Sequence, residues 1–405
     1  MKIMRAQNCF TEESLIFLAK MLKNSGCGPS TAWPPGIVKC LSGDNIPSDV
    51  SIEAARSEAE EVIYPLVRDL LKKTNTNPAD VDILVINCSL FSPTPSLCSM
   101  VVNEFKMRPD ISSYNLSGMG CSAGLISIEL VQNLLAARPG ARAVVVSTEN
   151  LTQNLYHGNE RGFLLQNTLF RCGGAAMLLT NRWMDGFRST FKLLHCVRTQ
   201  LVSTDSFGCV YETEDPTSQR GVRLSKDIVK VAGRAMEKNF TTLGPYVLPI
   251  SEQLKTGFWM AVRYLQKVAI QRKIIDKDTA TKIAPYIPDF KRGIDHFCIH
   301  AGGRGVIDGI EANLNLSPEH VEASRHALYT YGNTSSSSIW YEMDYIRDRM
   351  NLKRGQRVLQ VAFGSGFKCN SAVWLCINST NASSTKEKYI APSSLKDNEK
   401  EKKEN

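Results

Sequence analysis

The sequence lacks any run of about 18 consecutive apolar residues, the length that a membrane-spanning helix needs, so we expect no membrane span in this chain. Its first residues, MKIMRAQNCF, also lack the apolar segment of a signal peptide. No Arg-rich stripe with interleaved aromatic residues is present, and the net charge of +8 is modest for 405 residues, so we expect no nucleic-acid partner. A mild positive field instead suits an anionic small substrate, such as a phosphate-bearing carrier.

Paired metal-binding cysteines are also missing. The twelve cysteines form no CxxC pair, and no His/Cys cluster has the spacing of a zinc site. Several lie in apolar, strand-like runs, as Cys88 does in DILVINCSL, which predicts free, buried thiols in a reducing compartment. The Asn-x-Ser/Thr sequons at Asn115, Asn150 and Asn333 are interpreted as chance matches, because a glycan would disrupt the motifs that hold the first and last.

The composition is that of a globular protein with a full core, with 43% apolar and 22% charged residues. Apolar, β-branched runs alternate with helical patterns, which predicts α/β layers with internally buried strands. Pro65 is expected to interrupt one helical pattern. Strands are predicted within 81–90, 141–150, 172–181, 191–199, 295–303 and 356–377, and helices within 10–26, 52–73, 96–107, 226–243, 306–314, 317–329 and 336–350.

Cys121 lies in NLSGMGCSAG, between glycines and just before the helical pattern LISIELVQNLLAAR. The N–H groups and dipole of a helix start favour a thiolate, which predicts a pKa below the ordinary value of about 8.5. Glycines at 118, 120 and 124 allow a sharp turn with space for a substrate carbonyl, and the amide of Cys121 can hold an oxyanion. The alternative is a buried cysteine in a tight turn.

Two further polar residues are predicted at strand–helix or turn–helix junctions, where open α/β sheets bind ligands. His300 lies in HFCIHAGGRGVID (296–308), and Asn333 lies in YGNTSSSSIWYE (331–342). Taken singly, His300 could cap a turn and Asn333 could be an N-cap.

Five ordered motifs resemble those of the plant-type 3-ketoacyl-CoA synthases, the condensing enzymes of very-long-chain fatty acid elongation. They are NLSGMGCSAG, STEN before TLFRCGGAAMLL, FCIHAGGR, YGNTSSSSIWYE and FGSGFKCNSAVW, and the resemblance covers most of residues 5–376. It implies an α/β fold, thiolase-like, with αβαβα layers and two similar halves. By the same resemblance, Cys121 is the nucleophile, while His300 and Asn333 are the catalytic histidine and asparagine.

The resemblance also implies supporting residues, a reaction and partners. His296 matches a supporting histidine, and Gly364, Ser365 and Gly366 match the loop that borders the cysteine. A long-chain acyl-CoA loads onto Cys121, and malonyl-CoA is decarboxylated and condensed to give a 3-oxoacyl-CoA, with no metal or other cofactor. The resemblance also implies a homodimer with elongase reductase and dehydratase partners. It implies a location at the cytosolic face of the endoplasmic reticulum membrane.

Four segments are expected. These are a helical region (1–75), a first half with the nucleophile (76–185), a second half with the histidine and asparagine (186–376), and a disordered polar tail (377–405). Family members usually begin with two membrane-spanning helices, and this chain opens just after the place where those would end. The terminal KKEN is similar to a dilysine retrieval signal, although a solvated charge run is the preferred interpretation.

Some residues depart from the family pattern or have only structural interpretations. Gln200 and Tyr329 stand where many relatives have histidine. Arg304 is expected to pair with Asp308 at helical spacing, and Cys369 to be a buried thiol. Arg161 and Lys368 are interpreted as surface charges.

Three other functions stay open at this point. A type III polyketide synthase uses the same Cys-His-Asn trio with malonyl-CoA. A degradative thiolase would need a second catalytic cysteine at the C-terminal glycine loop. A non-catalytic elongase subunit is the alternative from another class.

Overall fold

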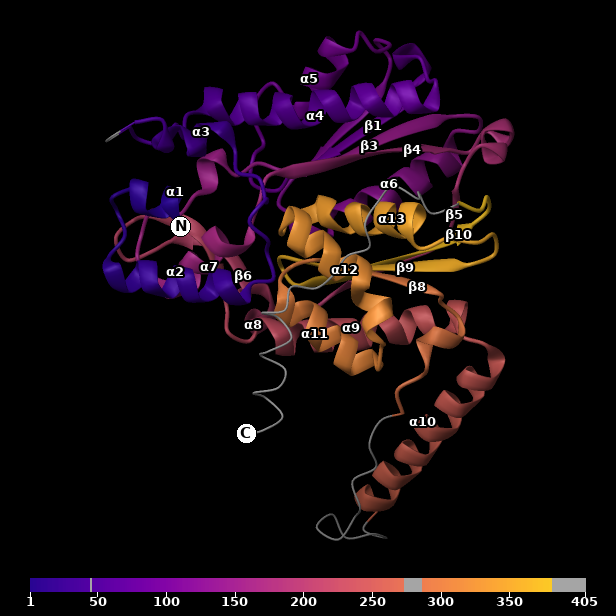
Figure 1. Cartoon of the computed structure of the whole chain (residues 1–405). Coiled ribbons are helices and arrows are strands. Elements are labelled where there is room, and N and C mark those ends of the chain that lie inside the picture. The colour runs from indigo at the N-terminus through magenta and orange to yellow at the C-terminus, as the bar shows by residue number, and fades with distance from the viewer. Residues whose placement is uncertain (44–45, 273–285, 381–405) are drawn as a thin grey trace.

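The computed structural model describes residues 1–43, 46–272 and 286–380, and the statements below refer to these residues. Two four-stranded sheets lie face to face, with helices outside each sheet and between them, so the chain forms five layers (Figure 1). This confirms the predicted αβαβα architecture. The predicted disorder after residue 380 and the KKEN terminus lie outside the described residues.

The first sheet has the order β2-β1-β3-β4, with β1 and β3 at its centre. β1 pairs in parallel with β2 and β3, and β4 runs antiparallel to β3. Alternate residues of β1 supply two cores, since Ile83 and Val85 face the middle layer while Leu84 and Ile86 face α4 and α5. The strands are β1 (Ile83–Asn87), β2 (Ser112–Leu116), β3 (Arg142–Glu149) and β4 (Gly173–Thr180).

The second sheet has the order β5-β10-β9-β8, and a glycine turn joins β9 to β10 as predicted. β8 is parallel to β9, while β5 and β10 are antiparallel to their neighbours. Helices α9 and α11 cover its outer face (Figure 1). The strands are β5 (Phe191–Gln200), β8 (His296–Ile299), β9 (Arg357–Gly364) and β10 (Lys368–Cys376), and a small separate hairpin pairs β6 (Val210–Glu214) with β7 (Arg220–Leu224).

The helices assigned among the described residues are α1 (Lys2–Ala6), α2 (Glu12–Asn24), α3 (Pro35–Val38), α4 (Ile52–Thr74), α5 (Leu97–Glu104), α6 (Ala123–Ala137), α7 (Arg161–Leu169), α8 (Thr204–Phe207), α9 (Ile228–Val247), α10 (Ile250–Gln271), α11 (Arg304–Leu314), α12 (Pro318–Tyr331) and α13 (Ser338–Arg349). Helices α1, α2 and α7 pack together as a side lobe (Figure 1).

Helices α6 and α13 form the middle layer, and their N-terminal ends meet. Ile128 of α6 and Ile339 of α13 belong to one apolar core with the inner faces of both sheets. A Cβ at Gly124 would lie 2.7 Å from the carbonyl oxygen of Ser336, so a glycine is required at this crossing. The crossing brings the turn before α6 against the turn before α13.

Three features of the helices differ from the sequence-based predictions. Helix α4 runs without interruption through Pro65, because its long buried face, from Ala55 to Leu71, offsets the loss of one backbone hydrogen bond. No helix was predicted at α7 or α10, or at the short helices α1, α3 and α8. Among the described residues, the helical stretch 120–137 has the length and composition of a membrane span, but half of it is buried and α6 is a core helix of the middle layer.

Candidate active site

Cys121 lies in the 3-10 turn Gly120–Ser122, directly before α6. Gly118 and Gly120 have φ angles of 67° and 68°, which glycine adopts without strain, so the sharp turn predicted from the sequence is present. The backbone N–H of Gly120 donates to Oγ of Ser89 at 2.9 Å, and this fixes the turn beside the end of β1. The residue as a whole is half-buried.

His300 follows the last residue of β8 and is only 3% exposed. Its backbone N–H donates to the carbonyl of Val361 on β9 at 2.9 Å, which continues the parallel pairing past the strand end. The imidazole Nδ1 lies 2.8 Å from Oγ of Ser338. Because this contact holds Nδ1, the other ring nitrogen, Nε2, is available to donate or accept a proton.

Asn333 follows α12 and Gly332, whose φ of 76° ends the helix. Its backbone pairs with the segment after α7, accepting from the N–H of Arg171 at 2.9 Å and donating to the carbonyl of Leu169 at 3.1 Å. The side-chain Nδ2 donates to the carbonyl of Gly302 at 3.2 Å, two residues beyond His300. The amide is therefore oriented by strands and turns from three parts of the chain.

One serine-rich turn brings the three predicted residues together. Oγ of Ser335 lies 3.5 Å from the sulfur of Cys121, and the N–H of Ser335 donates to Oδ1 of Asn333 at 2.9 Å. Oγ of Ser338, which contacts His300, also lies 2.9 Å from the carbonyl oxygen of Ser335. The structure thus joins Cys121, His300 and Asn333 through contacts within residues 333–338.

Glu149 and Ser335 are site residues that the sequence reasoning missed. Glu149 is buried at the end of β3, where Oε1 accepts from the N–H groups of Ser89 and Leu90, at 3.0 and 2.8 Å, and Oε2 accepts from Ser335 at 3.0 Å. Burial raises the pKa of this carboxyl. The only signal in the sequence was the STEN and SSSS letters, which carry no periodicity or spacing that predicts contact.

Ser335 is also held in an unusual backbone conformation. Its φ is 57°, in the left-handed region that non-glycine residues rarely adopt, and it is 2% exposed. Such a conformation costs about 1–3 kcal/mol and persists where surrounding contacts determine it. Here it directs one hydroxyl at both Cys121 and Glu149.

The glycine loop 364–366 lies against the cysteine turn, where the family resemblance placed it. A Cβ at Gly364 would lie 2.3 Å from Oγ of Ser122, and one at Gly120 would lie 2.4 Å from the backbone nitrogen of Ser365. Both glycines are therefore required by close backbone approach. Gln200 donates to the carbonyl of Gly366 at 3.4 Å, so this departure from the family pattern supports the same loop.

The electrostatics of the site correct the prediction of an acidic thiol. Burial raises the pKa of Cys121 to about 11, and the nearby Glu149 carboxylate acts in the same direction, while the hydrogen bond from Ser335 opposes them. Burial lowers the pKa of His300 to about 4, so its imidazole is neutral at neutral pH. In the resting site, loss of solvation outweighs the hydrogen bonds that favour the thiolate.

His296 does not share the site. It is the first residue of β8 and His300 follows the last, so about 13 Å of strand separates them. Nε2 of His296 lies 3.3 Å from Oε1 of Gln356. The resemblance suggested a supporting role for His296, and that role does not involve contact with the other site residues.

Other sequence-based predictions have mixed outcomes. Arg304 pairs with Asp308 at 3.5 Å, and Arg161 is an exposed partner of Glu13, both as predicted. Lys368 is not a free surface charge, because it is half-buried and donates to the carbonyl of Ser365 in the glycine loop at 2.6 Å.

Two further predictions concern thiols and Tyr329. All twelve cysteines are free, and Cys369 is fully buried in β10, which agrees with the structural interpretation of its thiol. Tyr329, the second departure from the family pattern, accepts through its carbonyl from the N–H of Gly28 at 2.8 Å and so holds the N-terminal connector. Asn150 and Asn333 are 2% and 3% exposed, so neither sequon is accessible to a glycan.

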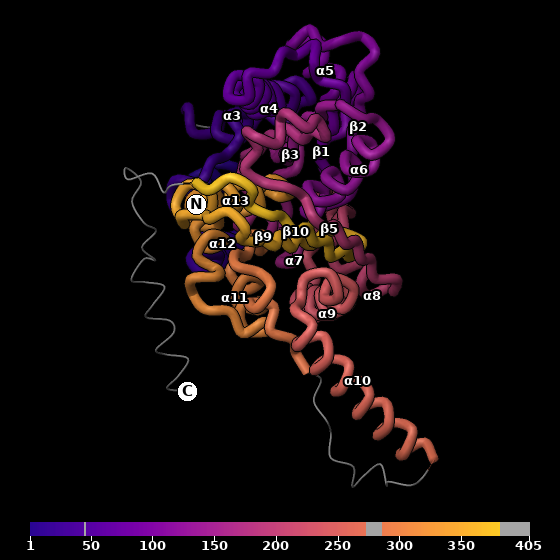
Figure 2. The backbone as a smooth tube through the Cα atoms, turned by 90° about the vertical axis from the view of Figure 1, so that its right-hand side faces the viewer, coloured from indigo at the N-terminus to yellow at the C-terminus, as the bar shows by residue number. Residues whose placement is uncertain are grey.

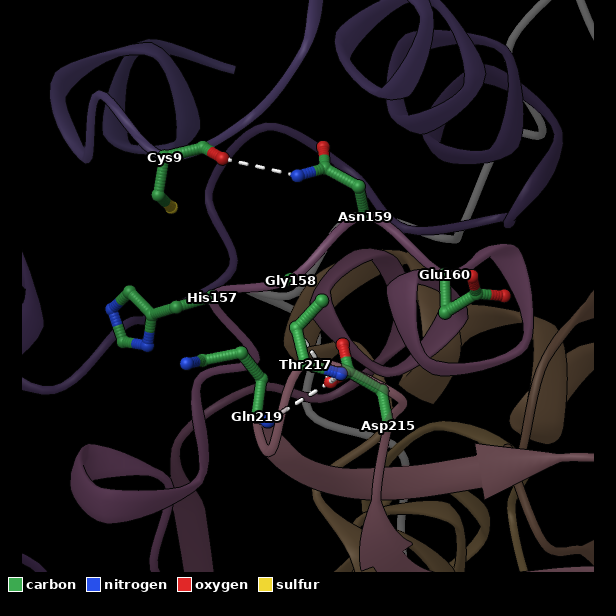
Figure 3. Close-up of a pocket in the computed structure, with 8 residues that line it drawn as sticks. All are labelled: Cys9, His157, Gly158, Asn159, Glu160, Asp215, Thr217 and Gln219. Atoms are coloured by element: carbon green, nitrogen blue, oxygen red, sulfur yellow. Dashed lines mark hydrogen bonds between the residues drawn. The ribbon is translucent and has the colours of Figure 1, made fainter.

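Cavities of two kinds occur among the described residues. The larger, of about 370 Å³, is open and lined mainly by residues of polar type, and none of the three predicted catalytic residues lines it (Figure 3). The smaller, of about 20 Å³, is mostly apolar and adjoins the site. The N–H of Leu90 donates to Glu149, Leu151 comes two residues after Glu149, and Phe170 pairs with Asn333. Its remaining lining residues are Trp33, Asn154, Leu155, Gln166 and Asn167.

Comparisons with known proteins decide the family. Residues 1–266 match the family described as "FAE1/Type III polyketide synthase-like protein", and residues 290–377 match "Chalcone and stilbene synthases, C-terminal domain". The chain is 53% identical over 365 residues to 3-ketoacyl-CoA synthase 6 of Arabidopsis thaliana, covering 90% of this chain and 70% of that relative. The chain belongs to the 3-ketoacyl-CoA synthase family. The resemblance stated from the five motifs is thereby confirmed, and so is an acyl-condensing acyltransferase.

A second plant relative of this 3-ketoacyl-CoA synthase is the probable 3-ketoacyl-CoA synthase 20 of Oryza sativa. The two chains are 49% identical over 375 residues, which cover 92% of this chain and 68% of the relative. Solved structures with a similar fold include a type III pentaketide synthase from Neurospora crassa, with a TM-score of 0.67, 19% identity, and coverage of 90% of this chain and 92% of that chain. Because the identity is low, this likeness confirms the thiolase-like fold alone.

Proposed function

We propose that this member of the family joins a long-chain acyl group to the two-carbon unit of malonyl-CoA, with Cys121, His300 and Asn333 as its catalytic residues. The observation that carries the proposal is the serine-rich turn, through which one thiol, one neutral imidazole and one carboxamide meet. A nucleophile beside two uncharged hydrogen-bond donors suits a thioester that is first captured and then attacked by an enolate.

In the first step, Cys121 attacks the acyl-CoA carbonyl. When Ser338 directs its proton at the carbonyl of Ser335, it accepts from Nδ1–H of His300 and leaves Nε2 free to accept the thiol proton. Because the pKa of the resting thiol is about 11, proton transfer accompanies attack rather than preceding it. The sulfur–carbon bond forms, the bond to CoA breaks, and the CoA sulfur leaves with a proton.

In the second step, malonyl-CoA loses carbon dioxide, and the electron pair of the broken carbon–carbon bond forms an enolate. Its oxygen accepts from Nδ2 of Asn333 and from Nε2–H of His300. Between the two steps the ring gives its Nδ1 proton to water and takes a proton from water at Nε2, and Ser338 then stabilises this tautomer by donating to Nδ1. The enolate carbon attacks the acyl thioester, a carbon–carbon bond forms, and the Cys121 thiolate leaves and takes a proton from water. The products are a 3-oxoacyl-CoA, CoA and carbon dioxide.

The apolar cavity beside the site supports an acyl substrate. Leu90, Leu151 and Phe170 line it, and all three lie next to residues that contact the serine-rich turn or Asn333. We place the apolar wall of the acyl site at these three side chains, which must move apart to admit the chain, because a cavity of about 20 Å³ holds little more than one water molecule.

The setting of the reaction is part of the same proposal. We place the protein at the cytosolic face of the endoplasmic reticulum, as a homodimer with reductase and dehydratase partners, on the strength of the family resemblance. A 3-oxoacyl-CoA must be reduced and dehydrated before another round of extension, so enzymes of those two reaction classes have to consume the product.

The experiment is incubation of the purified chain with a panel of acyl-CoA thioesters, followed by peptide mass analysis, and then addition of malonyl-CoA with mass analysis of products. We expect an acyl adduct on Cys121 and a linear product two carbons longer. Cys121→Ala should form neither, whereas Cys9→Ala, at a half-buried thiol outside the site, should form both. Absence of the adduct in the native protein would overturn the proposal, and repeated extension with ring formation would favour a polyketide synthase.

A further inference from the structure

Helix α10 (Ile250–Gln271) projects from the five-layered body, and its far end stands well away from it (Figures 1 and 2). Its only buried residue is Glu252, in the first turn. That carboxylate accepts from Oη of Tyr286 at 2.6 Å and from Nη1 of Arg292 at 2.8 Å, and it pairs with Lys255 at 3.0 Å. The base of the helix is therefore fixed to the body, and this sets the direction in which the rest projects.

The projecting part carries a continuous apolar face. Ile250, Leu254, Phe258 and Leu265 follow one another at intervals of four or seven residues, which places them on one side of a helix. Leu254 is 70% exposed, and Phe258 and Leu265 are each 64% exposed. A soluble protein rarely leaves so many large apolar side chains together in water, so this face marks an interaction surface.

The positive charge on α10 favours an anionic partner. Glu252 is the helix's one acidic residue, and its partners already neutralise it. Beyond the first turn, Arg263, Lys267 and the C-cap Arg272 are exposed cations without an acidic residue on the helix to balance them. Two copies of such a helix laid side by side would repel each other, whereas an anionic lipid surface attracts basic side chains by about 1 kcal/mol each.

We propose that α10 is a lipid-binding helix that lies along an anionic membrane surface, with its apolar face among the outer acyl carbons and its cations at the headgroups. Tyr264, which is 68% exposed, lies at the edge of this apolar face, and such a ring favours the boundary between headgroups and acyl chains. Its 22 residues extend about 33 Å, which gives a long contact along the surface. It is not a span, since among the described residues only 120–137 has that composition.

The test is co-sedimentation of the full chain with vesicles of phosphatidylcholine alone and of equal parts phosphatidylcholine and phosphatidylserine. We expect binding that is stronger to the anionic vesicles and falls as salt is added. Leu254→Ser, Phe258→Ser and Leu265→Ser combined should lower the partition coefficient about tenfold or more, because insertion scales with buried apolar area. Arg263→Glu with Lys267→Glu should remove the preference for anionic vesicles.

Matched controls keep the result interpretable. Ile16→Ser and Val202→Ser replace apolar residues that are 63% and 94% exposed elsewhere, and should leave vesicle binding unchanged. Circular dichroism should show the same fold for all variants. Equal binding by the native chain and the triple serine variant would overturn the proposal. So would light scattering that shows, without lipid, a dimer that the triple variant loses, since a second copy would then cover the apolar face.

Discussion

The hydroxyl oxygen of Ser335 lies 3.5 Å from the sulfur of Cys121, and the same oxygen lies 3.0 Å from Oε2 of Glu149. A hydroxyl has one proton, so Ser335 can donate to only one of the two at a time. When it donates to the sulfur it stabilises negative charge there, and when it donates to Glu149 the sulfur loses that support. The orientation of one buried hydroxyl therefore bears on the reactivity of the proposed nucleophile.

The first prediction concerns the pH dependence of Cys121. A thiol with a pKa raised to about 11 is almost wholly protonated at neutral pH. Its alkylation by iodoacetamide, followed by peptide mass analysis, should accelerate as pH rises and show no plateau below about pH 10, because the thiolate fraction is still growing there. A plateau near neutral pH would mean that the helix start, not burial, governs the resting thiol.

The second prediction concerns the donor to that sulfur. Ser335→Ala should raise the thiol pKa further and slow alkylation of Cys121 about three- to tenfold at a given pH, the usual range for one lost hydrogen bond. Ser337→Ala is the matched control, because Ser337 is buried in the same turn but donates to the carbonyl of Thr334 at 2.8 Å. Equal alkylation rates for the two variants would argue against a role for the Ser335 hydroxyl.

The third prediction separates loading from condensation at Asn333. Asn333→Asp keeps the acceptor for the N–H of Ser335 but replaces the donor to Gly302 with a carboxylate oxygen. The variant should stay folded with a loss of about 1–3 kcal/mol in unfolding free energy, and condensation should fall about 100-fold or more, since a carboxylate repels the enolate. Acyl adducts on Cys121 should still form in mass spectra. Turnover close to that of the native chain would rule out the proposed amide role.

The fourth prediction uses two histidines on one strand. His300→Gln should lower condensation about 100-fold or more, because the buried ring is the proposed acceptor of the thiol proton. His296→Gln should keep activity close to native, since His296 lies at the opposite end of β8 beside Gln356. Rates from product analysis with saturating malonyl-CoA test both. A large loss in the His296 variant would restore a supporting role for that residue.

The fifth prediction concerns the contact between the glycine loop and the cysteine turn. Gly364→Ala would place a methyl group 2.3 Å from Oγ of Ser122 and 2.6 Å from the carbonyl of Met119, so one of the two turns must move. We expect a loss of about 1–3 kcal/mol in unfolding free energy together with slower acylation of Cys121. Gly186→Ala is the control, because nothing lies within 4 Å of a Cβ there. Identical melting temperatures for the two variants would contradict this close contact between the two turns.

Much of the fold followed from local patterns. The β-branched runs became buried strands such as β1 and β3, and the cysteine turn formed at glycines with positive φ. The pairing of Arg304 with Asp308 needed only helical spacing. Helix α4 shows the limit of such rules, because packing of its buried face carries it past Pro65.

The sequence by itself determined which chemical groups are present and which turns and strands hold them, because these depend on neighbouring residues. The tertiary structure alone decided what surrounds each group. Ser335 and Cys121 are 214 residues apart in the chain, and their contact exists only because α6 and α13 cross between the two sheets. The raised pKa of Cys121 and the exposed apolar face of α10 have the same origin, since access to water is set by the packing of distant segments.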